Sequence, residues 1–287
     1  MPRSGFTLTR PDALTSSVVC ASPHSGRDYT WSFMRRSALS ELTMRSSEDA
    51  FVDQLIEDAP RFGAPLLTAT VPRAFVDLNR SVDELDPALI DGVRKSGYNP
   101  RVASGLGVIP RVVANSRAIY RGKLSHVEAR KRLTDYWFPY HDQLASLLSE
   151  AHESFGTALL MDFHSMPHEA LDTVVRASKD RPNVVLGDRF GASANSDVVD
   201  LVEAAFASAG FKVARNTPFA GAYVTQTYGR PSRQQHAIQI EIDRSIYMDE
   251  ETLTPNANFN DVKQALTAVI ADVCEMRRGT SQPVAAE

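Results

Sequence analysis

Residues 157–167 read Thr-Ala-Leu-Leu-Met-Asp-Phe-His-Ser-Met-Pro. Their first part, 157–163, is an apolar run of strand length, and it is followed at once by a histidine, a serine and a proline. An amphipathic segment precedes the run: Ser125 and Glu128 form a capping box, and apolar residues then recur every three or four positions up to Leu148. A helix that leads into a buried strand is the unit from which α/β folds are built.

The same alternation extends over the rest of the chain. Six further apolar or β-branched runs are expected to be strands: 17–21, 65–69, 183–186, 212–214, 222–227 and 237–242. Two more amphipathic helices are expected over 196–208, with Gly210 at its carboxyl-terminal turn, and over 260–276. No repeat or linker divides the pattern. It predicts one α/β domain over residues 1–287, with a mixed, largely parallel sheet flanked by helices.

Residues 83–121 are the least regular part of this predicted domain. The glycines and prolines that interrupt them include Gly92, Gly97, Pro100, Gly105, Gly107 and Pro110. Irregular segments of this length often act as lids or binding loops. A solvated insertion is the alternative interpretation.

Composition narrows the class of protein. The 287 residues are 43% hydrophobic and 23% charged, with a net charge of −4, which is typical of a globular protein and not of a nucleic-acid or anionic-membrane binder. No apolar run approaches the ~18 residues that span a bilayer, and no signal peptide is recognisable. Cys20 and Cys274 are expected to be reduced core thiols. We therefore expect a cytoplasmic protein that acts on a small molecule, with its oligomeric state open.

Two histidines follow predicted strands directly. His24 stands in Ser-Pro-His-Ser-Gly at 22–26, and His164 follows the strand at 157–163. Either histidine alone could be an ordinary loop residue. Two histidines at two strand ends would be a coincidence if both were. Since the carboxyl ends of parallel strands form ligand sites and neutral imidazole is a common metal ligand, the pair indicates a metal site.

A second group of residues suits an anionic ligand. Asn79 and Arg80 lie side by side after the apolar stretch that follows the strand at 65–69. A guanidinium can hold a carboxylate with two parallel hydrogen bonds, and an amide can bind the same group. A surface ion pair is the alternative for Arg80.

The predicted strand at 237–242 has two different faces. Ile238, Ile240 and Ile242 alternate with polar residues, among them Glu241. If that polar face is buried, Glu241 needs a partner, and a metal or its water would provide one. A sheet with one solvated face is the alternative. Together with the histidines and Arg80, a buried Glu241 would suggest metal-assisted hydrolysis.

Four motifs in order resemble the N-formylglutamate amidohydrolase family. They are Pro-His-Ser-Gly at 23–26, Val-Asp-Leu-Asn-Arg at 76–80, Asp-x-His-Ser-Met-Pro at 162–167 and Gln-x-Glu-Ile-x-Arg at 239–244. Weaker matches are Tyr-His at 140–141, Asn-x-Pro-Phe-x-Gly-x-Tyr at 216–223 and Ile-Tyr-Met at 246–248. The resemblance covers about residues 22–250.

The resemblance implies a fold like that of the zinc carboxypeptidases, and hydrolysis of N-formyl-L-glutamate to formate and L-glutamate in histidine degradation. It implies that His24 and His164 bind zinc and that Glu241 is the general base. It also implies that Asn79, Arg80, Asn216 and Tyr223 bind the substrate, with Asn79 and Arg80 on its carboxylate.

The sequence leaves three candidates for the third metal ligand. Relatives of the family carry a Glu ligand three residues after the first His, where this chain has Arg27. Asp49, Asp28 and Asp77 are the candidates to replace it. We favour Asp49, because 47–53 resembles the acidic helix start of the family, and Asp77 could instead orient a ligand.

Other functions compete with N-formylglutamate hydrolysis. A serine hydrolase is disfavoured, since the chain has no Gly-x-Ser-x-Gly elbow. Either a deacylase for another N-acyl amino acid or a non-catalytic binding protein with the same fold is the alternative to N-formylglutamate hydrolysis.

Overall fold

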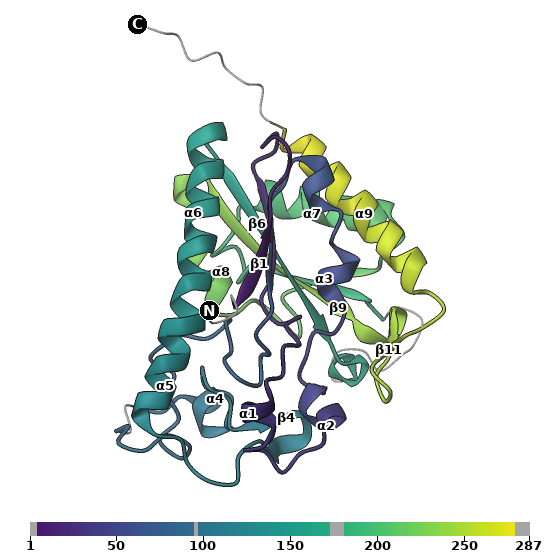
Figure 1. The fold of residues 1–287 in the computed structure, drawn as a ribbon. Coiled ribbons are helices and arrows are strands. Elements are labelled where there is room, and N and C mark those ends of the chain that lie inside the picture. Colours follow the sequence, from purple (N-terminus) through teal and green to yellow (C-terminus); the bar gives the residue numbers. More distant parts are fainter. Residues whose placement is uncertain (1–4, 95–96, 173–180, 279–287) are drawn as a thin grey trace, which may run out of the picture.

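The computed structural model describes residues 5–94, 97–172 and 181–278. Its centre is a seven-stranded sheet that crosses the middle of the molecule (Figure 1). In spatial order the strands are β1 (Phe6–Thr9), β3 (Leu66–Ala69), β2 (Val18–Ser22), β6 (Ala158–Met166), β9 (Gln235–Asp243), β7 (Val184–Gly187) and β8 (Val213–Arg215). The pairs β3–β2, β2–β6, β6–β9 and β7–β8 are parallel, whereas β1 and β7 pair antiparallel with β3 and β9. The predicted mixed, largely parallel sheet is confirmed.

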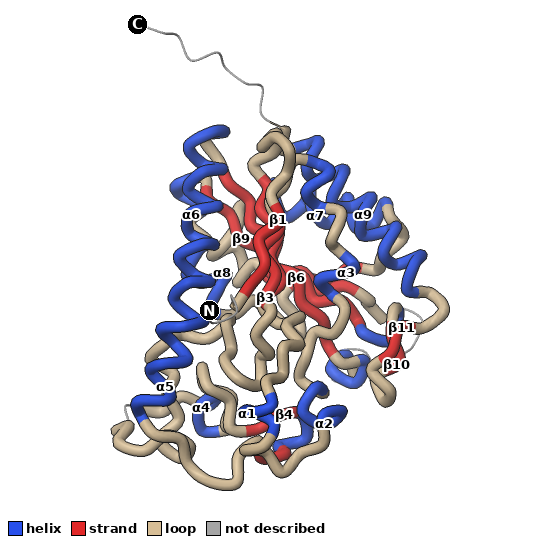
Figure 2. Tube along the Cα trace, viewed as in Figure 1, coloured by secondary structure: helices blue, strands red, loops and turns tan. Residues whose placement is uncertain are grey.

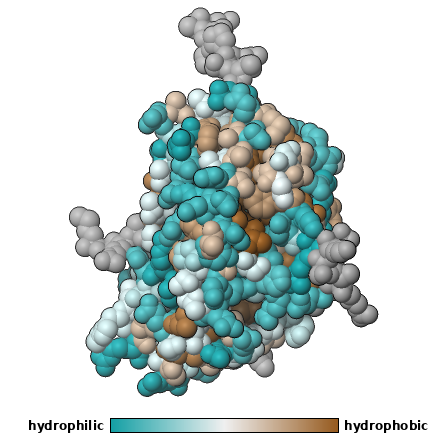
Figure 3. All heavy atoms as spheres, turned by 90° about the vertical axis from the view of Figure 1, so that its right-hand side faces the viewer, coloured by the Kyte–Doolittle hydropathy of each residue, from teal (hydrophilic) through white to brown (hydrophobic). Residues whose placement is uncertain are grey.

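Two layers of helices cover the sheet, because each strand alternates apolar side chains between its faces. On one face α3 (Val52–Leu55), α7 (Ser196–Ser208) and α9 (Phe259–Met276) pack against the side of β9 that carries Ile238, Ile240 and Ile242. On the other, α5 (His126–Arg132), α6 (Phe138–Phe155) and α8 (Tyr223–Tyr228) lie over Leu160 and Ala237. The surface on the α9 side mixes hydrophilic and hydrophobic residues (Figure 3).

The part of the molecule beside the carboxyl ends of β2, β6 and β9 consists mainly of loops (Figure 2). Its helices and strands are short: α1 (Trp31–Met34), α2 (Glu41–Arg45), α4 (Pro100–Ala103), β4 (Val112–Val113), β5 (Arg117–Ala118), β10 (Met248–Asp249) and β11 (Thr254–Pro255). In the described part of the chain, no helix is long and apolar enough to cross a membrane. Cys20 and Cys274 are both buried and free, as expected.

The predicted long helix exists, with an irregularity that its spacing does not reveal. The Ser125 hydroxyl accepts the N–H of Glu128 at 3.2 Å, as the capping box predicts. Between α5 and α6 the chain forms a π-helical turn over Leu133–Trp137. Pro139 is the second residue after that turn, and since proline lacks an N–H it cannot complete the ordinary hydrogen-bond ladder.

One of the strand predictions needs correction. Residues 222–227 are not a strand: residues 223–228 form the helix α8, although valine, threonine and tyrosine favour strands. Tertiary contacts decide the matter, because α8 packs on β9 and the N–H of Val224 is bonded to Asn79 Oδ1 at 2.8 Å. The sequence interpretation also missed β1, a four-residue edge strand that is only half-buried.

Candidate metal centre and adjoining cleft

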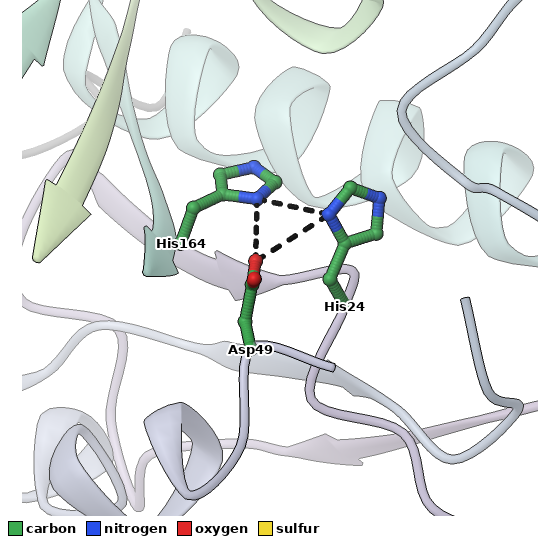
Figure 4. A group of neighbouring side chains, drawn as sticks. All are labelled: His24, Asp49 and His164. Atoms are coloured by element: carbon green, nitrogen blue, oxygen red, sulfur yellow. Dashed lines mark hydrogen bonds and ion pairs between the residues drawn. The ribbon is translucent and has the colours of Figure 1, made fainter. Parts of the chain in front are cut away.

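Three buried side chains from separate parts of the chain meet at the edge of the sheet (Figure 4). His24 follows β2, His164 lies near the end of β6, and Asp49 precedes α3. The Nδ1 atoms of the two histidines are 3.1 Å apart, and Asp49 Oδ2 lies 3.0 Å from His164 Nδ1 and 3.4 Å from His24 Nδ1. No more than 2% of any of the three residues is exposed.

Local structure explains why His24 points at this place. Gly26 sits where the loop after β2 passes the chain end of β3, and a Cβ there would lie 2.1 Å from the carbonyl oxygen of Val71. Only glycine allows so close an approach of two backbones. The N–H of Asp49 then bonds the carbonyl of His24 at 3.0 Å, so the two candidate ligands are tied through their main chains.

A carboxylate binds the far nitrogen of each imidazole. His24 Nε2 donates to Asp77 Oδ1 at 2.7 Å, and His164 Nε2 donates to Asp162 Oδ2 at 3.0 Å. With the proton on Nε2, each Nδ1 presents a lone pair toward the other and toward Asp49. Three acceptors that face one another repel unless a positive charge lies between them, so these residues fit a metal ion.

The charges around the three residues support the same conclusion. Although burial opposes it, Asp162 and Asp49 raise the pKa of His164 well above its usual value, so the two carboxylates favour a positive charge at this ring, which either a proton or a metal ion can supply. Burial also opposes ionisation of Asp49, but the two neighbouring imidazoles hold its pKa well below the usual range. Arg244 Nη2 adds a bond to Asp49 Oδ1 at 3.2 Å. The site therefore holds an ionised carboxylate and favours a cation beside it.

The structure separates the three candidates for the third ligand. Asp49 lies with the two Nδ1 atoms, whereas Asp77 contacts only the opposite nitrogen of His24 and is held there by Arg73 Nε at 3.0 Å. Although burial opposes it, Arg73 and His24 hold the pKa of Asp77 well below its usual range. Asp28 is not part of the cluster among the described residues.

Glu241 lies beside the metal candidate, on the polar face of β9. It is the register partner of His164 across the β6–β9 pair, and it is 7% exposed. The alternative of a solvated sheet face is therefore wrong. Burial raises the pKa of Glu241 to about 7, while Gln239 Nε2 donates to its Oε1 at 2.6 Å. A carboxylate in this state can exchange a proton near neutral pH.

The four predicted substrate residues lie in different places. Arg80 and Tyr223 line a cleft of about 1090 Å³, whose other walls come from residues 81–88, α4 and the loop after β7. Much of the irregular segment 83–121 thus forms a wall of this cleft. Asn79 lies between cleft and metal candidate: its Nδ2 is 3.3 Å from His164 Nε2 and from Gln239 Oε1.

The Arg80 guanidinium is held in place at the wall of the cleft, where it can bind an anion. Its Nη1 donates to the carbonyl of Asn79 at 2.9 Å and its Nε to that of Leu106 at 3.2 Å, and only 7% of the residue is exposed. Among the described residues, no carboxylate forms an ion pair with it. Trp137 Nε1, from the π-helical turn, donates to the Arg80 carbonyl at 2.9 Å and fixes the backbone. A surface ion pair, the alternative interpretation of Arg80, is wrong.

Asn216 does not line the cleft. Its Oδ1 accepts the N–H groups of Asp188 at 3.1 Å and of Phe190 at 3.2 Å, and its Nδ2 donates to Asp188 Oδ1 at 2.5 Å. The structure therefore places Asn216 as a support of the loop after β7, and its contact with a substrate stays a prediction.

Several residues of the site escaped the sequence interpretation. Asp162 and Arg244 stood inside quoted motifs without a role, and Arg73, which pairs with Asp77, was not considered. Arg189 lines the cleft from the loop after β7. The signal for Arg189 was present, because Gly-Asp-Arg at 187–189 follows a predicted strand just as His24 and His164 do.

Comparison with known proteins gives a consistent result. The family model described as N-formylglutamate amidohydrolase matches residues 16–248. An N-formylglutamate deformylase of Pseudomonas aeruginosa is 31% identical over 90% of this chain and 91% of its own, and one of Pseudomonas putida is 30% identical over 88% and 92%.

Solved structures agree with these matches. The crystal structure of an N-formylglutamate amidohydrolase from Ralstonia eutropha has 35% identity and a TM-score of 0.88, over 96% of this chain and 98% of its own. A gene product of Agrobacterium tumefaciens has 14% identity and a TM-score of 0.65, over 95% and 96%, and shares the fold.

Proposed function

Because this chain belongs to the N-formylglutamate amidohydrolase family and is therefore an amidohydrolase, we propose that it cleaves N-formyl-L-glutamate to formate and L-glutamate with one zinc ion. The observation that carries the proposal is the cluster of His24, Asp49 and His164 next to Glu241. Two imidazoles and one carboxylate form a donor set that suits zinc with an open position for catalysis.

The metal and the protein have separate tasks in this proposal. A bound zinc ion supplies a Lewis acid, which polarises the scissile carbonyl and makes water easier to deprotonate. His24, Asp49 and His164 hold the ion, while Asp77 and Asp162 keep the two imidazole rings in the required tautomer.

Glu241 is the general base of the proposed reaction. Burial raises its pKa to about 7, so at neutral pH it can take a proton from the attacking water and return it to the leaving nitrogen. The amide of Gln239 holds one carboxylate oxygen and leaves the other for the water. Neither step consumes a residue, so the base is restored at the end of each turnover.

Arg80 binds a carboxylate of the substrate, and Tyr223 forms part of the wall beside it. The free side of the Arg80 guanidinium faces the cleft, and burial lowers its pKa, so an anionic partner would offset the cost of burying the charge. Asn79 connects this cleft to the metal ligands, because it contacts both His164 and α8.

Formate release by zinc-loaded protein tests the proposal. N-formyl-L-glutamate should be turned over, excess chelator should abolish the activity, and added zinc should restore it. N-acetyl-L-glutamate offered at the same concentration tests the alternative of another N-acyl amino acid. A faster reaction with the acetyl compound would show that the substrate carries an acetyl group instead of a formyl group. Activity that survives chelation would refute the role of zinc.

We also propose that the chain is one amidohydrolase domain that works in the cytoplasm. Strands that begin between residues 6 and 235 join one sheet, which supports a single domain. The free thiols of Cys20 and Cys274 are typical of a reducing compartment.

A further inference from the structure

Arg189 occupies an unusual backbone conformation at the wall of the cleft. Its φ is +55° and that of Phe190 is also +55°, in the left-handed region that residues other than glycine seldom adopt. Strain of this kind persists only where the surroundings enforce it, and it concentrates at binding and catalytic sites.

Three contacts hold Arg189 in this left-handed backbone conformation. Its N–H donates to the carbonyl of Ala220 at 2.8 Å, and the amide oxygen of Asn216 accepts the N–H groups of both neighbours, Asp188 and Phe190. The side chain lies over Gly221, where a Cβ would be 3.2 Å from Arg189 Cγ. The position of the residue is thus fixed, and a glycine leaves room for its aliphatic stem.

The guanidinium of Arg189 is free despite this support. Among the described residues it forms no ion pair or side-chain hydrogen bond, and the adjacent Asp188 carboxylate is used inside the loop by Gly191 and Asn216. Arg111, another arginine of the cleft, is by contrast paired with Asp86 at 2.8 Å. Arg80 and Arg189 are therefore two half-buried or buried cations that reach one cleft from different elements without a carboxylate partner.

We propose that Arg189 binds a second carboxylate of the substrate, and that this contact selects N-acyl amino acids with an acidic side chain. The inference rests on the proposed function and deepens it, since N-formylglutamate carries two carboxylates and Arg80 accounts for only one. A substrate carboxylate that enters a cleft loses hydration, and a fixed guanidinium restores the lost hydrogen bonds in pairs. Asn216 acts through Arg189 as a positioning residue.

The test compares two substrates that differ only in the second charge. N-formyl-L-glutamate and N-formyl-L-glutamine are assayed with wild-type protein, Arg189→Gln and Arg189→Lys, all loaded with zinc. Loss of a charge-assisted pair should lower kcat/KM for the glutamate compound by ~10- to 100-fold in Arg189→Gln, mainly through KM, with Arg189→Lys in between. The glutamine compound should change less than about threefold.

Arg101, in the same cleft, is the other arginine that could account for a preference for the glutamate substrate. It is exposed on α4, so Arg101→Gln should leave the preference for glutamate over glutamine intact. Equal losses on both substrates in Arg189→Gln would overturn the proposal, and so would a preference that collapses in Arg101→Gln instead.

A binding measurement separates this inference from the proposed reaction. Glutarate carries two carboxylates and no amide, so its affinity can be measured by calorimetry whether or not the protein hydrolyses N-formylglutamate. Glutarate should bind at least ~10-fold more weakly to Arg189→Gln than to wild type, while butyrate should bind both alike. An inactive wild type with this pattern would refute the proposed substrate alone, and unchanged glutarate binding would refute the role of Arg189.

Discussion

Asp77→Asn probes the support of the metal candidate, because it removes a charge while it keeps the size of the side chain. Asp77 accepts three hydrogen bonds, from His24 Nε2 at 2.7 Å, from the N–H of Asn79 at 2.8 Å and from Arg73 Nε at 3.0 Å. An asparagine retains one acceptor oxygen and turns an NH₂ group toward a donor. At least one charge-assisted bond is then lost, at a cost of about 1.5–3 kcal/mol.

Two measurements divide this cost between metal binding and folding. Loss of the carboxylate that orients a histidine ligand should raise the zinc Kd by ~10- to 100-fold in a competition titration with a chromophoric chelator. In excess chelator, the melting temperature should fall by several degrees, at roughly 2–4 °C per kcal/mol for a chain of this size. Asp53→Asn is the matched control, since it removes a carboxylate that pairs with Arg27 at the surface.

The pH dependence of folding stability tests independently whether the Asp77 carboxylate stabilises the fold. Because the folded-state pKa of Asp77 is depressed, its ionisation stabilises the fold above the unfolded pKa of about 4 and this stabilisation is lost as pH falls through the folded value. The stability difference between Asp77→Asn and wild type should therefore shrink in acid. An unchanged zinc Kd would refute the supporting role, and complete loss of zinc would make Asp77 a ligand itself.

The remaining predictions concern the residues that face metal and substrate. His164→Ala should bind less than a stoichiometric amount of zinc after purification, and full zinc content would exclude it as a ligand. Glu241→Gln should retain zinc yet lose at least ~10²-fold in kcat, whereas near-normal turnover would assign the base to another carboxylate. In chelator the same variant should melt above wild type by a margin that grows from about pH 5 to about pH 8, because burial raises the pKa of Glu241 to about 7 and disfavours its ionised form. Arg80→Lys should lower kcat/KM for N-formylglutamate by ~10-fold or more and affect its diamide little; equal losses would mean that Arg80 supports the fold.

The parts of the site that could be predicted from sequence are those carried by buried strands. The alternation in β9 identified both its apolar face and Glu241, because a two-residue period fixes the face of every side chain. His24 and His164 were found because each lies at or just beyond the end of such a strand. Asp49 was suggested by family likeness, and its contact with both imidazoles depends on a loop whose path the local sequence does not determine.

What escaped prediction depends on contacts between distant segments. α8 was expected to be a strand, and the contact that anchors it is a hydrogen bond between Val224 and Asn79, 145 positions apart. Asn216 matched a family motif, yet its amide binds the chain around Arg189 instead of lining the cleft. Neither contact produces a periodic pattern of apolar residues in the sequence. Secondary-structure propensity and residue spacing therefore could not predict them.

The site therefore has two halves with different origins. The sheet places His164 and Glu241 opposite each other through the register of β6 and β9, and the loops after β2 and before α3 add His24 and Asp49. The cleft, by contrast, takes Arg80 and Arg189 from segments outside the strands, Arg80 after β3 and Arg189 after β7. Since the chemistry depends on the first half and the choice of substrate on the second, a change at Arg189 should alter which N-acyl amino acid is cleaved without loss of zinc.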